Sequence, residues 1–236
     1  MEEKIHYSQV AIMIYMIQSA VTLFNIPRIV AEGFGTNGWL VILPLSFICL
    51  VNILLINLVY KKGNGEGAIQ ILEGTLPKWV VYPIYVVMIG FFSLIAVMVA
   101  KHYMFIIQAY MFPQSSPNLL LAIYLLFCFY LLTKGIYNIS KIIVVFFFMT
   151  VWTVALLVVA LPEISLLRYT PYLFKGGSDP IAKGMEAYVA FLGYELILFV
   201  FPYIEKGPKV TKAIIGGASY LHNYLFRSVL CQLWLL

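Results

Sequence analysis

The chain has 236 residues, of which 63% are hydrophobic and 11% are charged, with a formal net charge of +5. Soluble domains are about half apolar and a quarter charged. The composition therefore excludes a soluble globular fold, because such a fold would lack the polar residues to cover its core. We expect an all-α polytopic transmembrane bundle that forms one domain, residues 1–236.

A helix needs about 20 apolar residues to cross a hydrocarbon core of about 30 Å. The sequence has about seven apolar runs of suitable length, separated by polar, Gly- and Pro-rich connections. The predicted spans are approximately 8–31, 39–60, 80–111, 118–133, 140–162, 184–203 and 213–236. Residues after about 218 are atypical, because His222, Asn223 and Arg227 crowd a run that should be compatible with lipid.

The positive charges predict the orientation of these spans. If the N-terminus is inside, the cytoplasmic segments carry nine Lys or Arg residues and the outer loops carry three. Cytoplasmic loops are enriched in Lys and Arg, so we expect a cytoplasmic N-terminus. The first residues lack the features of a secretory signal, and we expect the first span to remain as an uncleaved anchor.

Two connections have features of their own. The segment Glu66–Leu76 places Ile69, Leu72 and Leu76 on one helical face, which predicts a short helix lying on the inner membrane surface. The longer connection Glu163–Lys183 is predicted to be outside. It either covers the outer mouth of the bundle or is a packed connector.

Glu195 is the strongest candidate for a functional residue, because a carboxylate in the middle of a membrane span is costly. Gly193 weakens the helix before it, and Pro202 removes a backbone donor after it. Such a carboxylate can bind a cation, a substrate ammonium group or a proton. The alternative is a purely structural bond to a neighbouring helix.

The first span contains a segment similar to the one that follows Glu195. Ala20–Pro27 aligns without gaps on Glu195–Pro202 and shares Leu-Phe and the closing proline. Spans one and six are equivalent in a five-plus-five inverted repeat, and interrupted helices at equivalent places indicate a transporter's binding site. We therefore expect a partial fold of this kind with broken first and sixth helices.

Broken helices expose N–H groups at one half-helix end and C=O groups at the other, where a zwitterion can bind. Ser19, Thr22 and Asn25 either contact such a ligand or bond between helices. The predicted ligand-binding residues are Ser19, Ala20, Val21, Thr22, Asn25, Gly193, Tyr194 and Glu195.

Motifs of soluble enzymes are missing from the sequence. It has no phosphate-binding Gly loop, HExxH or CxxC pattern, and its three histidines are scattered. The three cysteines lie in separate apolar runs and are interpreted as small apolar fillers. We expect no catalytic residues, metal site, cofactor or nucleic-acid partner.

Taken together, these elements resemble the spore-germination permease family, the membrane-embedded B subunits of nutrient germinant receptors, which is related to amino-acid permeases with a LeuT-like fold. The resemblance covers roughly residues 1–217. It is carried by Ile5–Gln9, Pro27, Gly33–Trp39, Gly193–Glu195 and Pro202.

The resemblance implies a multi-pass protein of the bacterial cell membrane or inner spore membrane. It implies a subunit that senses a small nutrient such as an amino acid, together with other receptor subunits. Ala20 stands where the family would have a glycine, and family members run to about ten spans, so we expect a C-terminally truncated member. The alternatives are a proton-coupled amino-acid permease and a structural or assembly subunit with a vestigial pocket.

The predicted orientation can be tested by labelling with a membrane-impermeant thiol reagent. A cysteine introduced at Asn64 should stay unlabelled in intact cells and react after permeabilisation, because the connection between Lys61 and Lys78 is expected inside. A cysteine in the connection 112–118 should react without permeabilisation. Strong external labelling at position 64 would reverse the topology.

Overall fold

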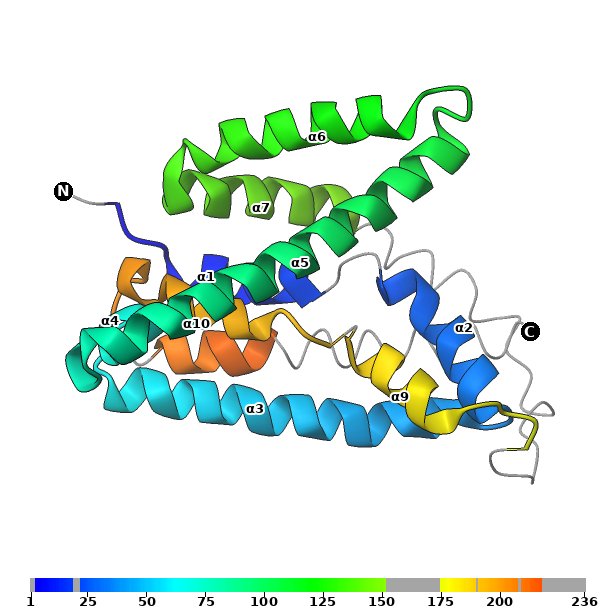
Figure 1. Ribbon diagram of the computed structural model, residues 1–236. Helices are drawn as coiled ribbons and strands as arrows, with labels where there is room; N and C mark the ends of the chain where they lie inside the picture. The colour runs from blue at the N-terminus through cyan, green and yellow to red at the C-terminus, as the bar shows by residue number, and fades with distance from the viewer. Residues whose placement is uncertain (1–2, 19–21, 152–174, 190, 208, 218–236) are drawn as a thin grey trace.

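A computed structural model describes residues 3–18, 22–151, 175–189, 191–207 and 209–217 (Figure 1). This part of the chain is helical apart from connections and one isolated bridge. The elements are α1 Tyr7–Gln18, α2 Thr22–Phe34, η1 Gly38–Val41, α3 Ile42–Lys62, α4 Ala68–Thr75, α5 Lys78–Tyr110, α6 Pro117–Leu132, α7 Gly135–Val151, α9 Pro180–Val189, η4 Tyr194–Leu196, α10 Ile197–Val200, η5 Phe201–Tyr203 and a helix at 209–217.

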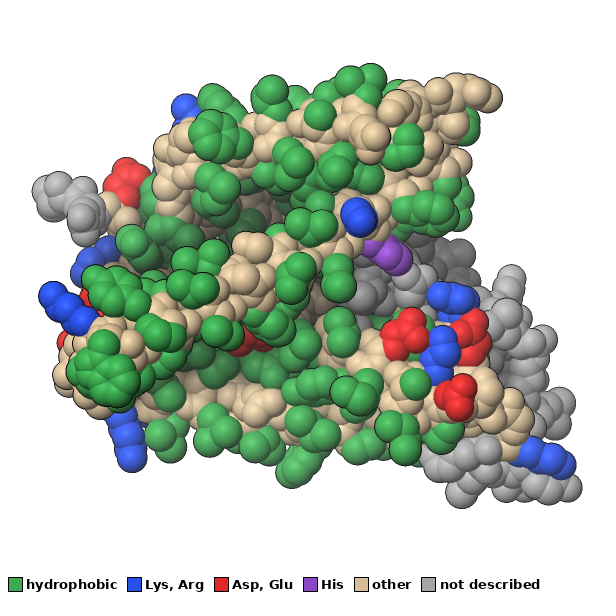
Figure 2. Space-filling view, in the orientation of Figure 1, with side chains coloured by type: hydrophobic (Ala, Val, Ile, Leu, Met, Phe, Trp, Pro, Cys, Tyr) green, Lys and Arg blue, Asp and Glu red, His purple; other side chains and the backbone are tan. Residues whose placement is uncertain are grey.

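Three helical segments are long and apolar enough to cross a membrane: Gly38–Lys62, Lys78–Tyr110 and Pro180–Tyr203, the last of which includes residue 190 outside the described part. Apolar side chains cover the surface of these helices (Figure 2). On α5, for example, Val86 and Val87 are each 71% exposed. A surface of this kind is stable against lipid and unstable in water, so the chain is an all-α membrane protein.

Helices α6 and α7 are shorter apolar helices joined by a tight turn at Gly135, whose φ is 76°. They lie side by side above α5 in Figure 1. Tyr15 of α1 and Phe147 of α7 pack edge to face, with ring centroids 5.5 Å apart. Whether each of these helices crosses the bilayer, as the seven predicted spans require, stays a prediction. Most of the last predicted span lies outside the described residues.

The first and sixth predicted spans are each divided into separate helices. The first consists of α1 and α2, which run in different directions in Figure 1 and are separated by residues outside the described part. The sixth consists of α9, then a turn that ends in Gly193, then the short helices η4, α10 and η5. The expected interruption of the sixth span is therefore present, whereas the expected interruption of the first span falls on residues 19–21, outside the described part.

At one end of the bundle, α2 packs against α9 through backbone and charged contacts. The amide of Ser178 donates to the carbonyl of Glu32 at 2.9 Å, and that of Thr36 donates to the carbonyl of Lys175 at 3.1 Å. The carboxylate of Glu32 forms ion pairs with Arg28 and Lys183, at 3.1 and 3.0 Å. The described part of the connection 163–183 thus packs on the end of the first span.

At the other end, the N-terminal segment pairs with the chain that follows the sixth span. Ile5 and Ile204 form a parallel bridge, in which the Ile5 amide donates to the Tyr203 carbonyl at 2.8 Å and the Glu205 amide donates to the Ile5 carbonyl at 3.0 Å. The predicted short helix is α4, which packs on α10 here. Gly67 lets it approach closely, since a Cβ there would lie 2.9 Å from Pro202 Cγ.

The core lies where α1, α3 and the broken sixth span meet. Its largest fully buried side chains are Phe191 and Phe201, surrounded by isoleucines from the other elements. The ring of Phe201 meets that of Tyr60 edge-on, with centroids 4.9 Å apart. Apolar packing therefore surrounds the segment that carries the break.

The ion pairs around Glu32 make the contact between α2 and α9 sensitive to acid. The hydrogen bond from Lys183 is the largest cause that lowers the pKa of the Glu32 carboxyl below its ordinary value of 4.5. A lowered pKa in the folded state stabilises the protein above the ordinary carboxyl pKa, and this contribution is lost as the pH falls through the lowered value.

We therefore expect Lys183→Met to lower the melting temperature slightly at neutral pH, because exposed ion pairs contribute little. The difference from the parent protein should vanish well below pH 4.5, the ordinary value for Glu32. Lys101→Met, an exposed position on α5, is the control and should show no such pH dependence. A difference that persists unchanged in acid would contradict the role of the Glu32 charge.

Candidate functional site

The break in the sixth span is built around Gly193, which precedes η4. Its φ of 112° lies in the region that L side chains avoid. A Cβ at this position would also lie 2.7 Å from Cγ2 of Ile17 in α1. Glycine is therefore needed both for the turn of the backbone and for the close approach of the first span.

Glu195 lies in the first turn after this break and is half-buried. Its Oε2 accepts a hydrogen bond from the Gly193 amide at 2.8 Å. One carboxylate oxygen thus satisfies a backbone donor at the start of η4, as the side chain at a helix N-terminus commonly does. Glu195 therefore has a local structural contact as well as a charge placed at the break.

Tyr194 points its hydroxyl toward the second predicted span. The Asn52 amide nitrogen donates to it at 2.9 Å and to the Tyr188 hydroxyl at 3.2 Å, and the two hydroxyls lie 3.3 Å apart. Tyr194 is 6% exposed. Asn52 of α3 therefore joins the helix before the break, which carries Tyr188, to the helix after it.

Gln18, the last residue of α1, joins the first span to the same break. Its Nε2 donates to the carbonyl of Phe191 at 2.8 Å and lies 3.5 Å from Sγ of Cys49. The side chain is 1% exposed. Its Oε1 is buried and has no hydrogen-bond partner within the described part of the structure.

The predicted residues of the first span are only partly placed. Ser19, Ala20 and Val21 lie outside the described residues. Thr22 and Asn25 lie in the first turns of α2, and their side chains are not among those described. Of the predicted set, Gly193, Tyr194 and Glu195 are thus brought together next to the end of α1, and their role in ligand binding stays a prediction.

Two kinds of polar group lie near the break and bear on which ligands could bind there. The C-terminal end of α1 carries partial negative charge and the N-terminal end of α2 carries partial positive charge. The Glu195 carboxylate and the Oε1 of Gln18, which has no partner among the described residues, add acceptors near the first of these ends. An ammonium group suits the acceptors, and a carboxylate suits the helix N-terminus.

Gln18, Asn52 and Tyr188 were not among the predicted site residues, although they form its hydrogen bonds. Gln18 and Asn52 could have been predicted as site residues, because each is a polar side chain inside an otherwise apolar run. Cys49 was interpreted as an apolar filler. It is fully buried, and its Sγ also lies next to the Gln18 amide. Among the described residues, no group of three His, Cys, Asp or Glu could hold a metal ion.

An all-α membrane protein whose broken sixth span contacts the end of α1 is the class that the fold and this site define. Residues 4–235 match the family model described as spore germination protein. The chain therefore belongs to the spore germination protein family, a group of permease type. The match extends past residue 217, where the resemblance based on motifs ended.

Curated relatives support the same family at low identity. The chain is 26% identical to spore germination protein GerQB of Bacillus cereus over 82% of its length and 54% of the relative. It is 22% identical to spore germination protein B2 of Bacillus subtilis over 92% of its length and 60% of the relative. The chain thus spans little more than half the length of these relatives. No solved structure matches.

The contact between Gln18 and Phe191 should be measurable in protein stability. Gln18→Leu removes the bond from Nε2 to the buried Phe191 carbonyl, at 2.8 Å, and keeps the weaker contact of that carbonyl with the Cys49 thiol at 3.8 Å. Loss of a buried hydrogen bond costs about 1–3 kcal/mol. We expect a lower melting temperature for the purified protein in detergent. The control is Gln9→Leu on the same helix, where the side chain accepts a bond from the His6 amide at the surface. Equal melting temperatures for Gln18→Leu and the parent would contradict the role of the bond.

Proposed function

We propose that this chain is a membrane-embedded subunit of a germinant receptor and that it senses a small nutrient, an amino acid, at the junction of its two broken helices. The observation that carries the proposal is the contact between the breaks. Gln18 at the end of α1 bonds to Phe191, and Gly193 packs on Ile17. Membership of the spore germination protein family supports the biological role.

The proposed ligand lies between the end of α1, the start of α2 and the start of η4. Its ammonium group is recognised by the Glu195 carboxylate and by the partial negative charge at the end of α1. Its carboxylate lies at the first turn of α2, near Thr22 and Asn25. Ser19, Ala20 and Val21 connect the two half-helices and complete the site.

Sensing then follows from the way the break is held. Asn52 joins Tyr188 before the break to Tyr194 after it, so a ligand that changes the position of η4 also changes the contact with α3. Other receptor subunits, in the bacterial cell membrane or the inner spore membrane, would receive this change. The N-terminus and α4 lie on the cytoplasmic side in this proposal.

Glu195→Gln tests the charge in ligand recognition. Glutamine keeps the size of the side chain and an acceptor for the Gly193 amide, so we expect normal abundance in the membrane. Loss of a hydrogen bond to a charged group, about 1.5–3 kcal/mol, corresponds to a response shifted to roughly 10- to 100-fold higher nutrient concentration. The measurement is germination against nutrient concentration in spores that carry the complete receptor.

The matched control is Glu205→Gln, an exposed carboxylate that follows the sixth span. It should leave the response unchanged. A Glu195→Gln protein that responds at parental concentrations would exclude the charge from recognition. A protein that disappears from the membrane would favour the structural role indicated by the bond to Gly193.

A proton-coupled permease is the second candidate, and the half-buried Glu195 carboxylate favours it. In that case purified protein in vesicles should accumulate labelled amino acid when an inward proton gradient is applied, and Glu195→Gln should abolish the dependence on the gradient. Saturable binding without uptake supports sensing. Normal germination with every pocket residue replaced would favour a structural or assembly subunit.

A further inference from the structure

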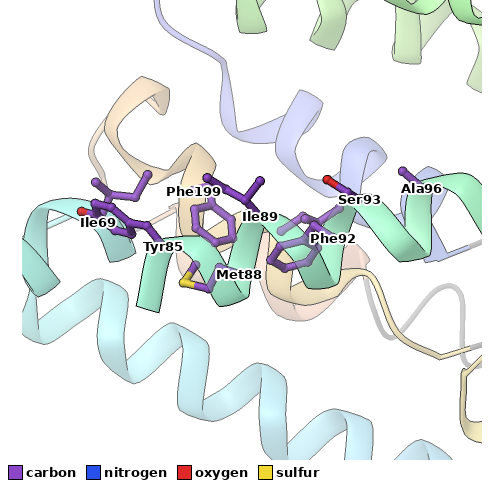
Figure 3. A pocket seen from close by; sticks show the side chains of 9 residues that line it. Ile69, Tyr85, Met88, Ile89, Phe92, Ser93, Ala96 and Phe199 are labelled. Carbon is purple, nitrogen blue, oxygen red and sulfur yellow. The ribbon is translucent and has the colours of Figure 1, made fainter. Parts of the chain in front are cut away.

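A groove of about 650 Å³ lies between α4, α5 and the second half of the broken span (Figure 3). Six of its residues come from one face of α5, since they recur at helical spacing. Ile69 of α4, Leu196 of η4 and Phe199 of α10 complete the lining. The residues from α5 are Tyr85, Met88, Ile89, Phe92, Ser93 and Ala96. The lining is therefore almost entirely apolar.

The groove extends along α5. Its residues on α5 run from Tyr85 to Ala96 (Figure 3), which at 1.5 Å per residue is about 16 Å along the helix. One leaflet of the hydrocarbon core is about 15 Å thick, half of the whole core. The Phe92 ring meets that of Phe199 at its edge, with centroids 5.7 Å apart, and joins the two walls. The groove thus has the length of an acyl chain in one leaflet.

The end of the groove near α4 is polar and is the end closer to a membrane interface. The Tyr85 hydroxyl donates to Oε1 of Glu73 at 3.0 Å. Trp79, at the start of α5, is 77% exposed, and exposed tryptophans of membrane helices mark the interface with water. The opposite end, at Ala96, is apolar. The groove therefore runs from the interface toward the middle of the bilayer.

Two exposed charges of opposite sign stand near this polar end. Lys78 lies seven residues before Tyr85, two turns along the same face of α5 and about 10 Å closer to the interface. Glu73 is the last charged residue of α4 and holds the Tyr85 hydroxyl. A cation and a carboxylate together match the phosphate and the ammonium group of a zwitterionic amine headgroup.

We propose that this groove is a binding site for a phosphatidylethanolamine molecule of the leaflet that α4 faces. One acyl chain lies along α5 between Tyr85 and Ala96, and the headgroup lies between Lys78 and Glu73. The acyl chain contacts Leu196, which lies in η4 with Glu195, and Phe199 of the following helix α10. Lipid occupancy therefore supports the half-helix after the break from its outer side.

The test uses the purified protein in vesicles of phosphatidylglycerol. A trace of phosphatidylethanolamine carries a photoactivatable diazirine midway along one acyl chain, and mass spectrometry maps the adducts after irradiation. We expect excess labelling of Met88, Phe92 and Phe199 over Val87 and Leu94, which lie on the opposite face of α5. Unlabelled phosphatidylethanolamine should compete for the excess. Equal labelling of both faces would mean only ordinary lipid contact and would overturn the proposal.

Two pairs of variants locate the site. Ala96→Trp fills the apolar end and should abolish the excess labelling, whereas Leu94→Trp, on the opposite face at the same depth, should leave it intact. If Ala96→Trp does not accumulate, Ser93→Phe serves the same purpose. Lys78→Ala should abolish the excess for the phosphatidylethanolamine probe, and Lys101→Ala near the other end of α5 should not.

A different occupant would give a different pattern. If a second copy of the chain covers the groove, a cysteine at Ser93 forms crosslinked dimers and the lipid adducts are missing, which overturns the proposal. If excess labelling survives both Ala96→Trp and Ser93→Phe, the acyl chain of the probe binds elsewhere. The groove is then not its site. Failure of nutrient binding, in contrast, leaves the lipid result unaffected, because the proposal does not depend on the nutrient site.

Discussion

The structure depends on the way a helix break is satisfied inside a membrane. In hydrocarbon, an unpaired backbone group costs several kcal/mol, so irregular backbone persists only where protein groups satisfy it. The break in the sixth span meets this condition with side chains. The Gln18 amide bonds to the Phe191 carbonyl, and the Glu195 carboxylate bonds to the Gly193 amide. The first of these contacts also fixes the end of α1 against the sixth span.

The sequence predicted the class of structure well, because composition and run length respond directly to the bilayer. Long apolar runs predicted α3 and α5, and the spacing of Ile69, Leu72 and Leu76 predicted α4. Gly193 predicted the break of the sixth span, since glycine before a buried carboxylate is a local signal. Helix length, the apolar face of α4 and the break at Gly193 depend on residues that are close together in the sequence. The sequence alone can therefore predict them.

The partners within the site were harder to predict because they are distant in the chain. Gln18 and Phe191 are separated by 173 positions, and Asn52 and Tyr194 by 142. The local contact of Glu195 was also missed, since a carboxylate near mid-span was interpreted through its charge alone. This bond runs to the backbone two positions earlier, at the turn where Gly193 has a positive φ, and the backbone conformation is not apparent from residue types.

The bridge between Ile5 and Ile204 has a consequence for the order of assembly. Its first partner, Ile5, is synthesised almost 200 residues before its second, Ile204, and before the carbonyl of Tyr203. At about 5–20 residues per second, the N-terminal segment waits roughly 10–40 s before it can pair. The bridge is therefore a late event, which forms only after the sixth span has entered the bundle and which joins Ile5 to a segment made far later, just after η5.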